Sequence, residues 1–272
     1  MLDAAGTARH QRSRGELRLS FKRRGAATVL DGLRQEGCLK ARFPRSDGAE
    51  AVLLNTSGGV AGGDVLGTVI AAGPGTRASV ATQAAERFYR ALPGTTALVG
   101  NEIEVAAGAA LEWLPQESIF FDGCSVRRTL RVAMAGDASF LGVESLVFGR
   151  RAMGETVRRA EIHDLIEIRR AGRLLLHDRV RLIGDVAAAL GRRAIGAGSC
   201  ALATVVYVAV DAEVRLETVR EGLAGFDAGA SAWDGMLLAR VVAPDAACLR
   251  AAVMAALAVL RIGRKLPGVW LC

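Results

Sequence analysis

The sequence predicts a mainly β protein with two α-helices in its C-terminal part. Turn signals such as Gly73-Pro74-Gly75 and Asp122-Gly123 recur steadily over residues 51–182. The runs between them have the length of strands and contain β-branched or aromatic residues. Two later stretches, 211–225 and 244–263, instead combine good helix formers with capping residues, so a helix is expected in each.

The N-terminal region divides into a tail and a strand. Residues 1–14 are expected to be a disordered basic arm, which can contact an acidic partner. Leu17, Leu19 and Phe21 then alternate with polar residues, as a strand with one buried face would. No repeat and no linker rich in Pro, Gly and Ser follows, so a single domain is expected over residues 15–272.

Two later elements can be described in more detail. A hairpin is expected over residues 161–183, with its turn at Ala171-Gly172. The second helix places Leu249, Val253, Ala256 and Leu260 on one side, and this apolar stripe suits a core or a partner.

Composition excludes several classes of protein. The 272 residues carry a formal charge of +7, but the arginines are spread along the chain in pairs, which is typical of a solvated face. A basic nucleic-acid-binding protein therefore remains only an alternative, without a second supporting motif. No apolar run reaches the roughly 18 residues that cross a bilayer, and no signal peptide is evident, so a cytoplasmic protein is expected.

Residues that commonly bind metals or perform catalysis form no familiar set. The five cysteines have wide, irregular spacing and are expected to be reduced; Cys272 is a weak candidate for a soft ligand. His10, His163 and His177 are too scattered for a metal triad, and no Gly-x-Ser-x-Gly, His-Glu-x-x-His or Cys-x-x-Cys motif occurs. No catalytic residue and no fixed metal site is predicted.

The stretch from Asn55 to Asp64, NTSGGVAGGD, is the most conspicuous in the chain. Its two Gly-Gly pairs demand a tight, non-helical backbone, and its flanks predict a loop between two strands. Gly58 and Gly63 have the spacing of a phosphate-binding loop, but Asp64 and Val65 stand where that loop needs a lysine and a hydroxyl. A turn that needs its glycines and an anion nest in an enzyme acting on a phosphorylated substrate both stay open. The loop residues concerned are Asn55, Thr56, Ser57, Gly58, Gly59, Gly62, Gly63 and Asp64.

Four further segments combine polar and aromatic residues: ATQAAERFYRA (81–91), LEWLPQESIFFDG (111–123), ASFLGVESLVFGRRAMGE (138–155) and LPGVWLC (266–272). Read alone, Tyr89 and Arg90 are more often a packing aromatic and a surface cation than a site. Glu112 and Glu117 form no evident acid/base pair. Glu144 lies among apolar residues, and because an unpaired buried carboxylate is costly, we expect the strand to expose it rather than to line a wet interior.

Together and in this order, the five segments resemble the signature segments of the UreD (UreH) family of urease accessory proteins. Gly268 replaces an arginine that is usual in the family, which argues against an ionic role for that position. The matching positions outside the glycine loop are Thr82, Gln83, Tyr89, Arg90, Pro115, Glu117, Glu144, Gly149, Arg150, Gly154, Glu155, Pro267 and Trp270.

The resemblance implies a stack of β-sheets of β-helix-like architecture and a maturation scaffold rather than an enzyme. It further implies that the protein binds apo-urease with UreF and the GTPase UreG, so that nickel reaches the urease active site. We expect the helix-rich end to form part of the UreF contact. No tightly bound cofactor is expected, only transient nickel. On this basis Asp64, Thr82, Gln83, Glu144 and Asp178 line a hydrated passage, where weak oxygen ligands pass a cation along without trapping it.

Overall fold

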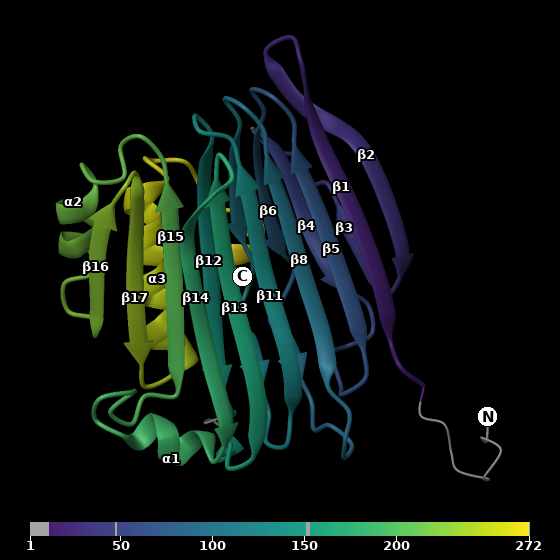
Figure 1. Cartoon of the computed structure of the whole chain (residues 1–272), viewed down its shortest axis with the longest axis vertical. Helices are drawn as coiled ribbons and strands as arrows, with labels where there is room; N and C mark the ends of the chain where they lie inside the picture. The colour runs from purple at the N-terminus through teal and green to yellow at the C-terminus, as the bar shows by residue number, and fades with distance from the viewer. Residues whose placement is uncertain (1–10, 47, 151–152, 272) are drawn as a thin grey trace.

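Two β-sheets stacked face to face make up most of the protein. The computed structural model describes residues 11–46, 48–150 and 153–271 (Figure 1). The first sheet has seven strands, in the order β14 (Arg173–Gly184), β13 (Ala160–Arg170), β11 (Ser125–Met134), β8 (Ala97–Val105), β5 (Val65–Ala72), β1 (Arg14–Arg24) and β2 (Ala27–Gly37).

The second sheet has ten strands, most of which follow one path. Their order is β16 (Ala228–Trp233), β17 (Met236–Ala243), β15 (Ala201–Val208), β12 (Ser139–Phe148), β9 (Ala110–Leu114), β6 (Arg77–Thr82), β4 (Ala49–Asn55) and β3 (Leu39–Arg42). Off this path, β10 (Ser118–Phe120) pairs in parallel with β12 and with β7 (Glu86–Phe88).

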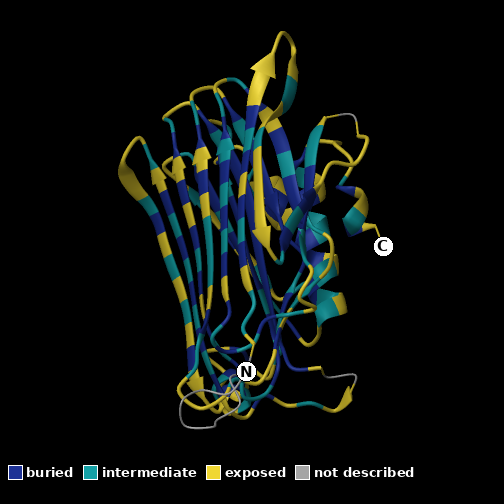
Figure 2. Ribbon diagram, turned by 90° about the vertical axis from the view of Figure 1, so that its right-hand side faces the viewer, coloured by how far each residue is buried: buried dark blue, intermediate teal, exposed yellow. Residues whose placement is uncertain are grey.

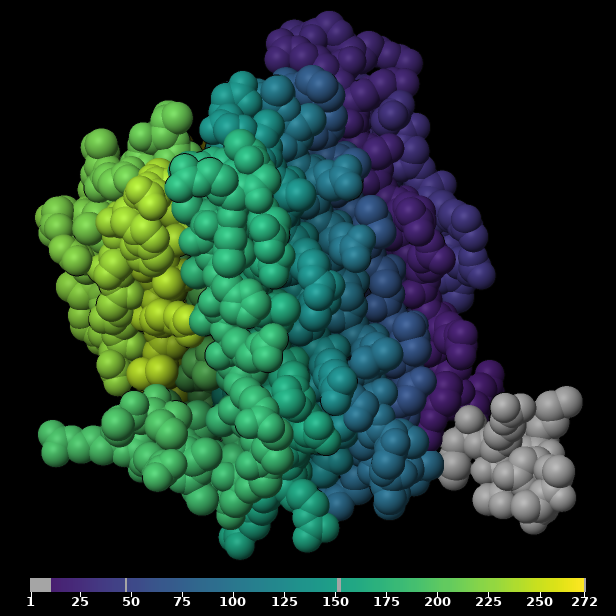
Figure 3. Space-filling model, viewed as in Figure 1, coloured from purple at the N-terminus to yellow at the C-terminus, as the bar shows by residue number. Residues whose placement is uncertain are grey.

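Between β4 and β13 the chain alternates between the two sheets, apart from the short strands β7 and β10, which stay in the second sheet. From β4 to β13 it places β4, β6, β9 and β12 in the second sheet and β5, β8, β11 and β13 in the first, and neighbours in each series are parallel. The result is a stack of coils, which confirms the mainly β, β-helix-like prediction. In Figure 3 these coils follow one another across the molecule from the purple N-terminal strands to the green and yellow C-terminal part.

Alternating side chains fill the space between the sheets. Along β13, every second residue from Ala160 to Ile168 is buried, and Ile162 and Ile168 are fully covered. Strand β12 is different because all residues from Phe140 to Phe148 are buried. One of its faces lies on the first sheet and the other on a helix, as expected for a strand covered on both sides.

Helices cover the outer face of the second sheet at its C-terminal end (Figure 2). Helices α2 (Leu216–Gly222) and α3 (Ala246–Leu260) lie within the two stretches predicted to be helical. The predicted stripe on α3 is entirely buried. A third helix, α1 (Val186–Gly191), was not predicted, although Asp185 caps it by accepting a hydrogen bond from Ala188 N at 2.9 Å.

Other sequence predictions can be compared directly with the fold. The hairpin is confirmed as β13 and β14, and its turn residues Ala171 and Gly172 have φ of 49° and 77°, which suits a tight two-residue connection. The glycine loop joins β4 to β5, as expected. Residues 1–10 of the predicted arm and Cys272 lie outside the described residues, whereas Arg14 already begins β1. Within the described part, no helix has the length and apolar character needed to cross a membrane.

Candidate functional site

A pocket of about 180 Å³ lies between the two sheets, beside the glycine loop. It is lined from both sides, because Thr68 and Asn101 come from neighbouring strands of the first sheet and Trp113 and Glu144 from the second. Its polar lining consists of Asn55, Thr68, Thr82, Gln83, Glu86, Arg87, Asn101, Gln116, Ser118, Arg128 and Glu144.

Several residues predicted from sequence meet in this pocket. Thr82 and Gln83, at the end of β6, and Glu144, in the middle of β12, all line it. The Thr82 hydroxyl also accepts a hydrogen bond from Gln116 N at 2.8 Å, which fixes the turn after Pro115. Signature residues that also contribute to the lining are Asn55, Gly58, Gly59 and Pro115.

Glu144 is buried, with only 4% of its surface exposed, so the expectation that its strand exposes it is wrong. The carboxylate is stabilised because both of its oxygens have partners. Trp113 Nε1 donates to Oε1 at 2.9 Å, and Arg128 Nη2 donates to Oε2 at 2.5 Å. Partners on β9, the neighbouring strand of the sheet, and on β11 of the opposite sheet thus offset the cost of burying the charge.

Arg128 joins Glu144 to a second buried acid. Its Nη1 donates to Asp164 Oδ1 at 2.9 Å, so one guanidinium bridges a carboxylate on β12 and a carboxylate on β13. Burial lowers the pKa of Arg128, but Asp164 and Glu144 raise it more, and the pKa lies above its usual value. Burial raises the pKa of Asp164 to about 6, although Arg128 opposes the shift.

Two further acids, Glu86 and Asp178, lie near the Arg128 ion pairs. Glu86, at the pocket, has a raised pKa because of burial, which the hydrogen bond from Asn55 Nδ2 at 3.1 Å partly offsets. Asp178 does not line the pocket; it accepts a hydrogen bond from Arg240, so this pair connects β14 with β17. Asp178 is nevertheless close enough for its charge to contribute to the raised pKa of Asp164.

The glycine loop is held by hydrogen bonds within the protein. Val60 N donates to Arg87 O and Tyr89 N donates to Val60 O, both at 2.7 Å, so the loop pairs with the end of β7. Gly59 has a φ of 137°, and a Cβ there would lie 2.4 Å from Tyr89 Cε2. A side chain at Gly62 would meet Thr95 Oγ1 at 2.4 Å. These contacts favour the interpretation of the loop as a turn that needs its glycines.

Amides on either side of both Gly-Gly pairs in the loop already have acceptors within the protein. Ser57 N donates to Asn55 Oδ1, and Ala61 N donates to Asp64 Oδ2. The amides of Thr56, Val60 and Asp64 donate to backbone carbonyls. Because an anion nest needs free N–H groups, the geometry disfavours the phosphate-binding alternative.

Asp64 stabilises the entry to the first strands rather than lining the pocket. It is 4% exposed, and its two oxygens accept from Ser13 N and Ala61 N, each at 2.8 Å. Thr56 donates from its hydroxyl to Cys38 O, which holds the other end of the loop against β3. These residues shape the loop beside the pocket.

An aromatic and arginine cluster lies outside the loop. The rings of Tyr89 and Phe121 meet edge to face at 5.2 Å, and the guanidinium of Arg150 lies 4.4 Å from the Phe121 ring centre. Arg90 pairs with Asp122 at 2.8 Å. Tyr89 and Arg90 are thus a packing aromatic and an exposed cation, in line with their reading from the sequence.

The Gly-Arg and Gly-Glu signature positions form one corner after β12. Arg150 Nε donates to Glu155 Oε2 at 2.8 Å. Gly149 has a φ of 83°, and a Cβ there would lie 2.8 Å from Glu155 O. Gly154 also has positive φ, which allows a turn in the chain directly before Glu155. The corner is a structural element beside Phe121.

The C-terminal segment, residues 261–270, docks on β9 and on the turn after it. Trp270 Nε1 donates to Leu114 O at 3.0 Å, and Gln116 Nε2 donates to Val269 O at 2.9 Å. Arg250 on α3 contacts Trp270, Gln116 and Glu117 together. Pro115 and Gln116 also line the pocket, so this segment supports one of its walls.

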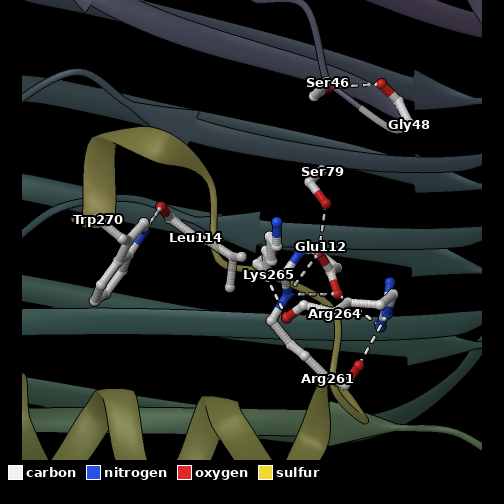
Figure 4. A network of polar contacts seen from close by, with 9 residues as sticks. All are labelled: Ser46, Gly48, Ser79, Glu112, Leu114, Arg261, Arg264, Lys265 and Trp270. Carbon is white, nitrogen blue, oxygen red and sulfur yellow. Dashed lines mark hydrogen bonds and ion pairs between the residues drawn. The ribbon is translucent and has the colours of Figure 1, made fainter.

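A second buried ion cluster anchors the start of the same segment (Figure 4). Glu112 on β9 accepts from Arg261 and Arg264 and from the hydroxyl of Ser79. Glu112 and Glu117 have different arginine partners, since Glu117 pairs with Arg250 and Glu112 with Arg261 and Arg264.

No fixed metal site is formed by the residues that the structure describes, since no three His, Cys, Asp or Glu side chains gather to hold an ion. His177 lies 3.6 Å from Glu167, and His163 lies 3.2 Å from Glu161. The pocket instead offers isolated oxygen donors. Such donors bind a divalent first-row cation weakly compared with a site of imidazole or thiolate ligands.

Sequence reasoning missed Arg128, the cation that pairs with Glu144, and Asp164, the second acid that pairs with Arg128. Arg128 was part of the pair Arg127-Arg128, which was assigned to a solvated face, and Asp164 lay unremarked within the predicted hairpin. One signal was available: Arg128 and Asp164 occupy the inward phase of alternating strands, where Val126, Leu130, Ile162 and Ile166 are apolar. A charge at an inward position needs a partner of opposite sign.

Comparison with known proteins gives a consistent result. The family model described as "UreD urease accessory protein" matches residues 13–270. The chain is 45% identical to the urease accessory protein UreD of Sinorhizobium medicae, with 99% of each chain covered. It is 44% identical to the protein of that name from Xanthobacter autotrophicus, over 97% of this chain and 91% of the relative. The corresponding protein from Dinoroseobacter shibae is 45% identical over 96% of this chain and 93% of the relative.

Proposed function

The chain belongs to the UreD family of urease accessory proteins, and from this premise we propose that it is a cytoplasmic scaffold that conducts nickel to the urease active site. In this role it binds apo-urease together with UreF and the GTPase UreG and performs no bond-making of its own. Nickel is its cargo. Family membership supports a role in urease maturation, and the polar pocket supports the finer proposal.

The observation that carries the nickel proposal is a polar lumen inside an otherwise apolar sandwich. Large apolar side chains such as Phe88 and Phe120 fill the neighbouring core, yet Thr68, Asn101 and Glu144 line the same pocket. Burying so many polar groups has a free-energy cost, and a fold that needed only stability would place apolar residues there. A hydrated path for a cation accounts for the cost.

The oxygen donors of the pocket suit the transfer of nickel better than its storage. Hydroxyl, amide and carboxylate oxygens from Thr82, Gln83 and Glu144 bind nickel more weakly than histidine or cysteine would. Asp178, linked electrostatically to the pocket through Asp164, extends the acidic character toward the edge of the sheets. Asp64 contributes by fixing the glycine loop beside the pocket.

Two surfaces suit the proposed partners. Beside α2, the turn after β15 carries Val210 and Val214, which are 94% and 83% exposed, so the helix-rich end offers apolar groups for UreF. The basic N-terminal arm suits an acidic partner.

Coexpression with the urease subunits, UreF and UreG tests the proposal. Glu144→Gln removes the charge while it preserves shape, so we expect the complex to copurify normally and urease activation to fall several-fold. Glu102→Gln, at an exposed position on β8, is the matched control and should activate urease as the wild type does. Normal activation by Glu144→Gln would exclude Glu144 from the path, and failure of the wild-type chain to copurify with urease would refute the scaffold.

A further inference from the structure

The guanidinium of Arg128 occupies the position that a cation would take between two buried carboxylates. It lies between Glu144 on the second sheet and Asp164 on the first, at 2.5 and 2.9 Å, and is itself buried. Both Arg128 and Glu144 line the pocket, so a cation entering it reaches their contact directly.

The charge balance around Arg128 leaves room for a second cation. One guanidinium faces the carboxylates of Glu144 and Asp164, and Glu86 lies close enough to contribute to its raised pKa. With these three acids ionised, the cluster carries one more negative than positive charge when Arg87, which also lines the pocket, is counted with Arg128. A guanidinium stays protonated at any pH at which a protein is folded, so its competition with a metal does not depend on its own titration.

We propose that Arg128 is a positioning residue of the cation path, which keeps Glu144 and Asp164 paired and aligned when the path is empty and competes with a divalent cation for both. The inference rests on the proposed nickel passage. The entering cation takes over part of the bonding of these carboxylates, and the returning guanidinium displaces it again. The pocket therefore binds nickel weakly and passes it on.

The geometry suits arginine better than lysine. The two hydrogen bonds leave from different nitrogens, Nη1 to Asp164 and Nη2 to Glu144, so a planar fork spans the gap between the sheets. A lysine ammonium is a compact charge on a flexible stem and does not reproduce this fork. Arg128→Lys should thus weaken the competition without removing it.

Nickel binding to the purified, untagged full-length chain tests the inference, by equilibrium dialysis against NiCl2. We expect Arg128→Met to bind nickel at least about tenfold more tightly than the wild type, since close charge pairs are commonly coupled by more than the 1.4 kcal/mol that tenfold represents. Arg131→Met, at an exposed position on the same strand, is the matched control and should bind as the wild type does. The double variant Arg128→Met/Glu144→Gln should lose this gain in nickel affinity, because it lacks the Glu144 carboxylate.

A purely structural ion pair would give a different result. Arg128→Met would then reduce thermal stability without raising nickel affinity, and equal or weaker binding by the folded variant overturns the inference. If circular dichroism shows that Arg128→Met does not fold, Arg128→Lys replaces it, with an expected rise in affinity of a few-fold; no rise overturns the inference equally.

Failure of the passage itself gives a separate signature. If Glu144→Gln activates urease normally in cells while Arg128→Met still binds nickel more tightly, Glu144 is not part of the passage and the competition at Glu144 stands. If Glu144→Gln impairs activation but Arg128→Met shows no tighter binding, the passage stands and the role of Arg128 is wrong.

Discussion

Arg261, directly after α3, holds the carboxylate of Glu112 in β9 across 149 positions of sequence. Its Nη2 donates to Oε2 at 2.8 Å, and its Nε lies 3.1 Å from both oxygens. Both side chains are about 95% buried, and Arg261 also donates to the carbonyls of Arg264 and Lys265. One buried arginine thus fixes the C-terminal segment to the centre of the second sheet (Figure 4).

Glu112→Leu is expected to lower the free energy of unfolding by about 3–5 kcal/mol, because it leaves the Arg261 guanidinium buried without its partner. Urea denaturation followed by circular dichroism measures the change. Arg264→Met removes the exposed partner of the same carboxylate and should cost less than about 1 kcal/mol. The double variant Glu112→Leu/Arg261→Met should recover much of the loss, and a double variant as unstable as Glu112→Leu would contradict the assignment.

Gly59→Ala is expected to destabilise the glycine loop by about 1–3 kcal/mol, because the position has positive φ and the new Cβ meets the Tyr89 ring. Gly67→Ala in β5 is the control, since nothing lies within 4 Å of a Cβ there and no positive φ is required. Thermal unfolding of both variants compares them. A Gly59→Ala variant as stable as the control would show that the loop accommodates a Cβ at position 59 and does not need this glycine.

Asp122→Asn is expected to lower stability at neutral pH by about 1–2 kcal/mol. Burial raises the pKa of Asp122. Hydrogen bonds from the amides of Arg159 and Arg158 and the charge of Arg90 lower it by more, so the net shift of the pKa is downward. An acid whose pKa is depressed on folding stabilises the protein above its unfolded pKa, and the gain disappears as pH falls through the folded pKa.

The pH dependence of the Asp122→Asn difference provides the check. Urea denaturation at a series of pH values should show that wild type and variant differ most near neutral pH and converge in acid, below the unfolded pKa of about 3.9. A difference that stays constant as the carboxylate is protonated would assign the effect to packing instead.

Cys124 is expected to resist alkylation in the native protein. Burial raises the pKa of its thiol to about 12, and the residue is only 2% exposed. Because the thiolate is the reactive form, iodoacetamide at pH 8 should modify Cys124 only after urea unfolds the chain, as mass spectrometry of peptides can show. Rapid modification under native conditions would mean that the turn between β10 and β11 opens frequently.

Much of the fold could be predicted because its signals are local. Turn residues separate the strands, the Ala171-Gly172 pair marks the hairpin, and Asp245 and the apolar stripe mark α3. Helix α1 was missed because it spans only six residues, too few to show a period. Strand β2 gave no clear period because it is an edge strand with little burial on either face.

The pocket could be predicted only in part. The signature segments identified Thr82, Gln83 and Glu144, which the coils bring together. The burial of Glu144 was misjudged because its stabilising partners come from β9 and β11, and the pairing of distant strands leaves no mark in the sequence near residue 144. A single sequence reveals an acid among apolar residues but not the arginine on the opposite sheet.

The docking of Trp270 on Leu114 has a consequence for biosynthesis. The two residues are separated by 156 positions, so β9 leaves the ribosome long before the tryptophan that covers it has been translated. Until the C-terminal part has been made, the nascent coils expose the apolar surface of the second sheet that α3 and Trp270 later cover. A chaperone or a partner that binds during translation would meet this surface before the protein has closed it, and premature termination before residue 270 would leave it open to aggregation.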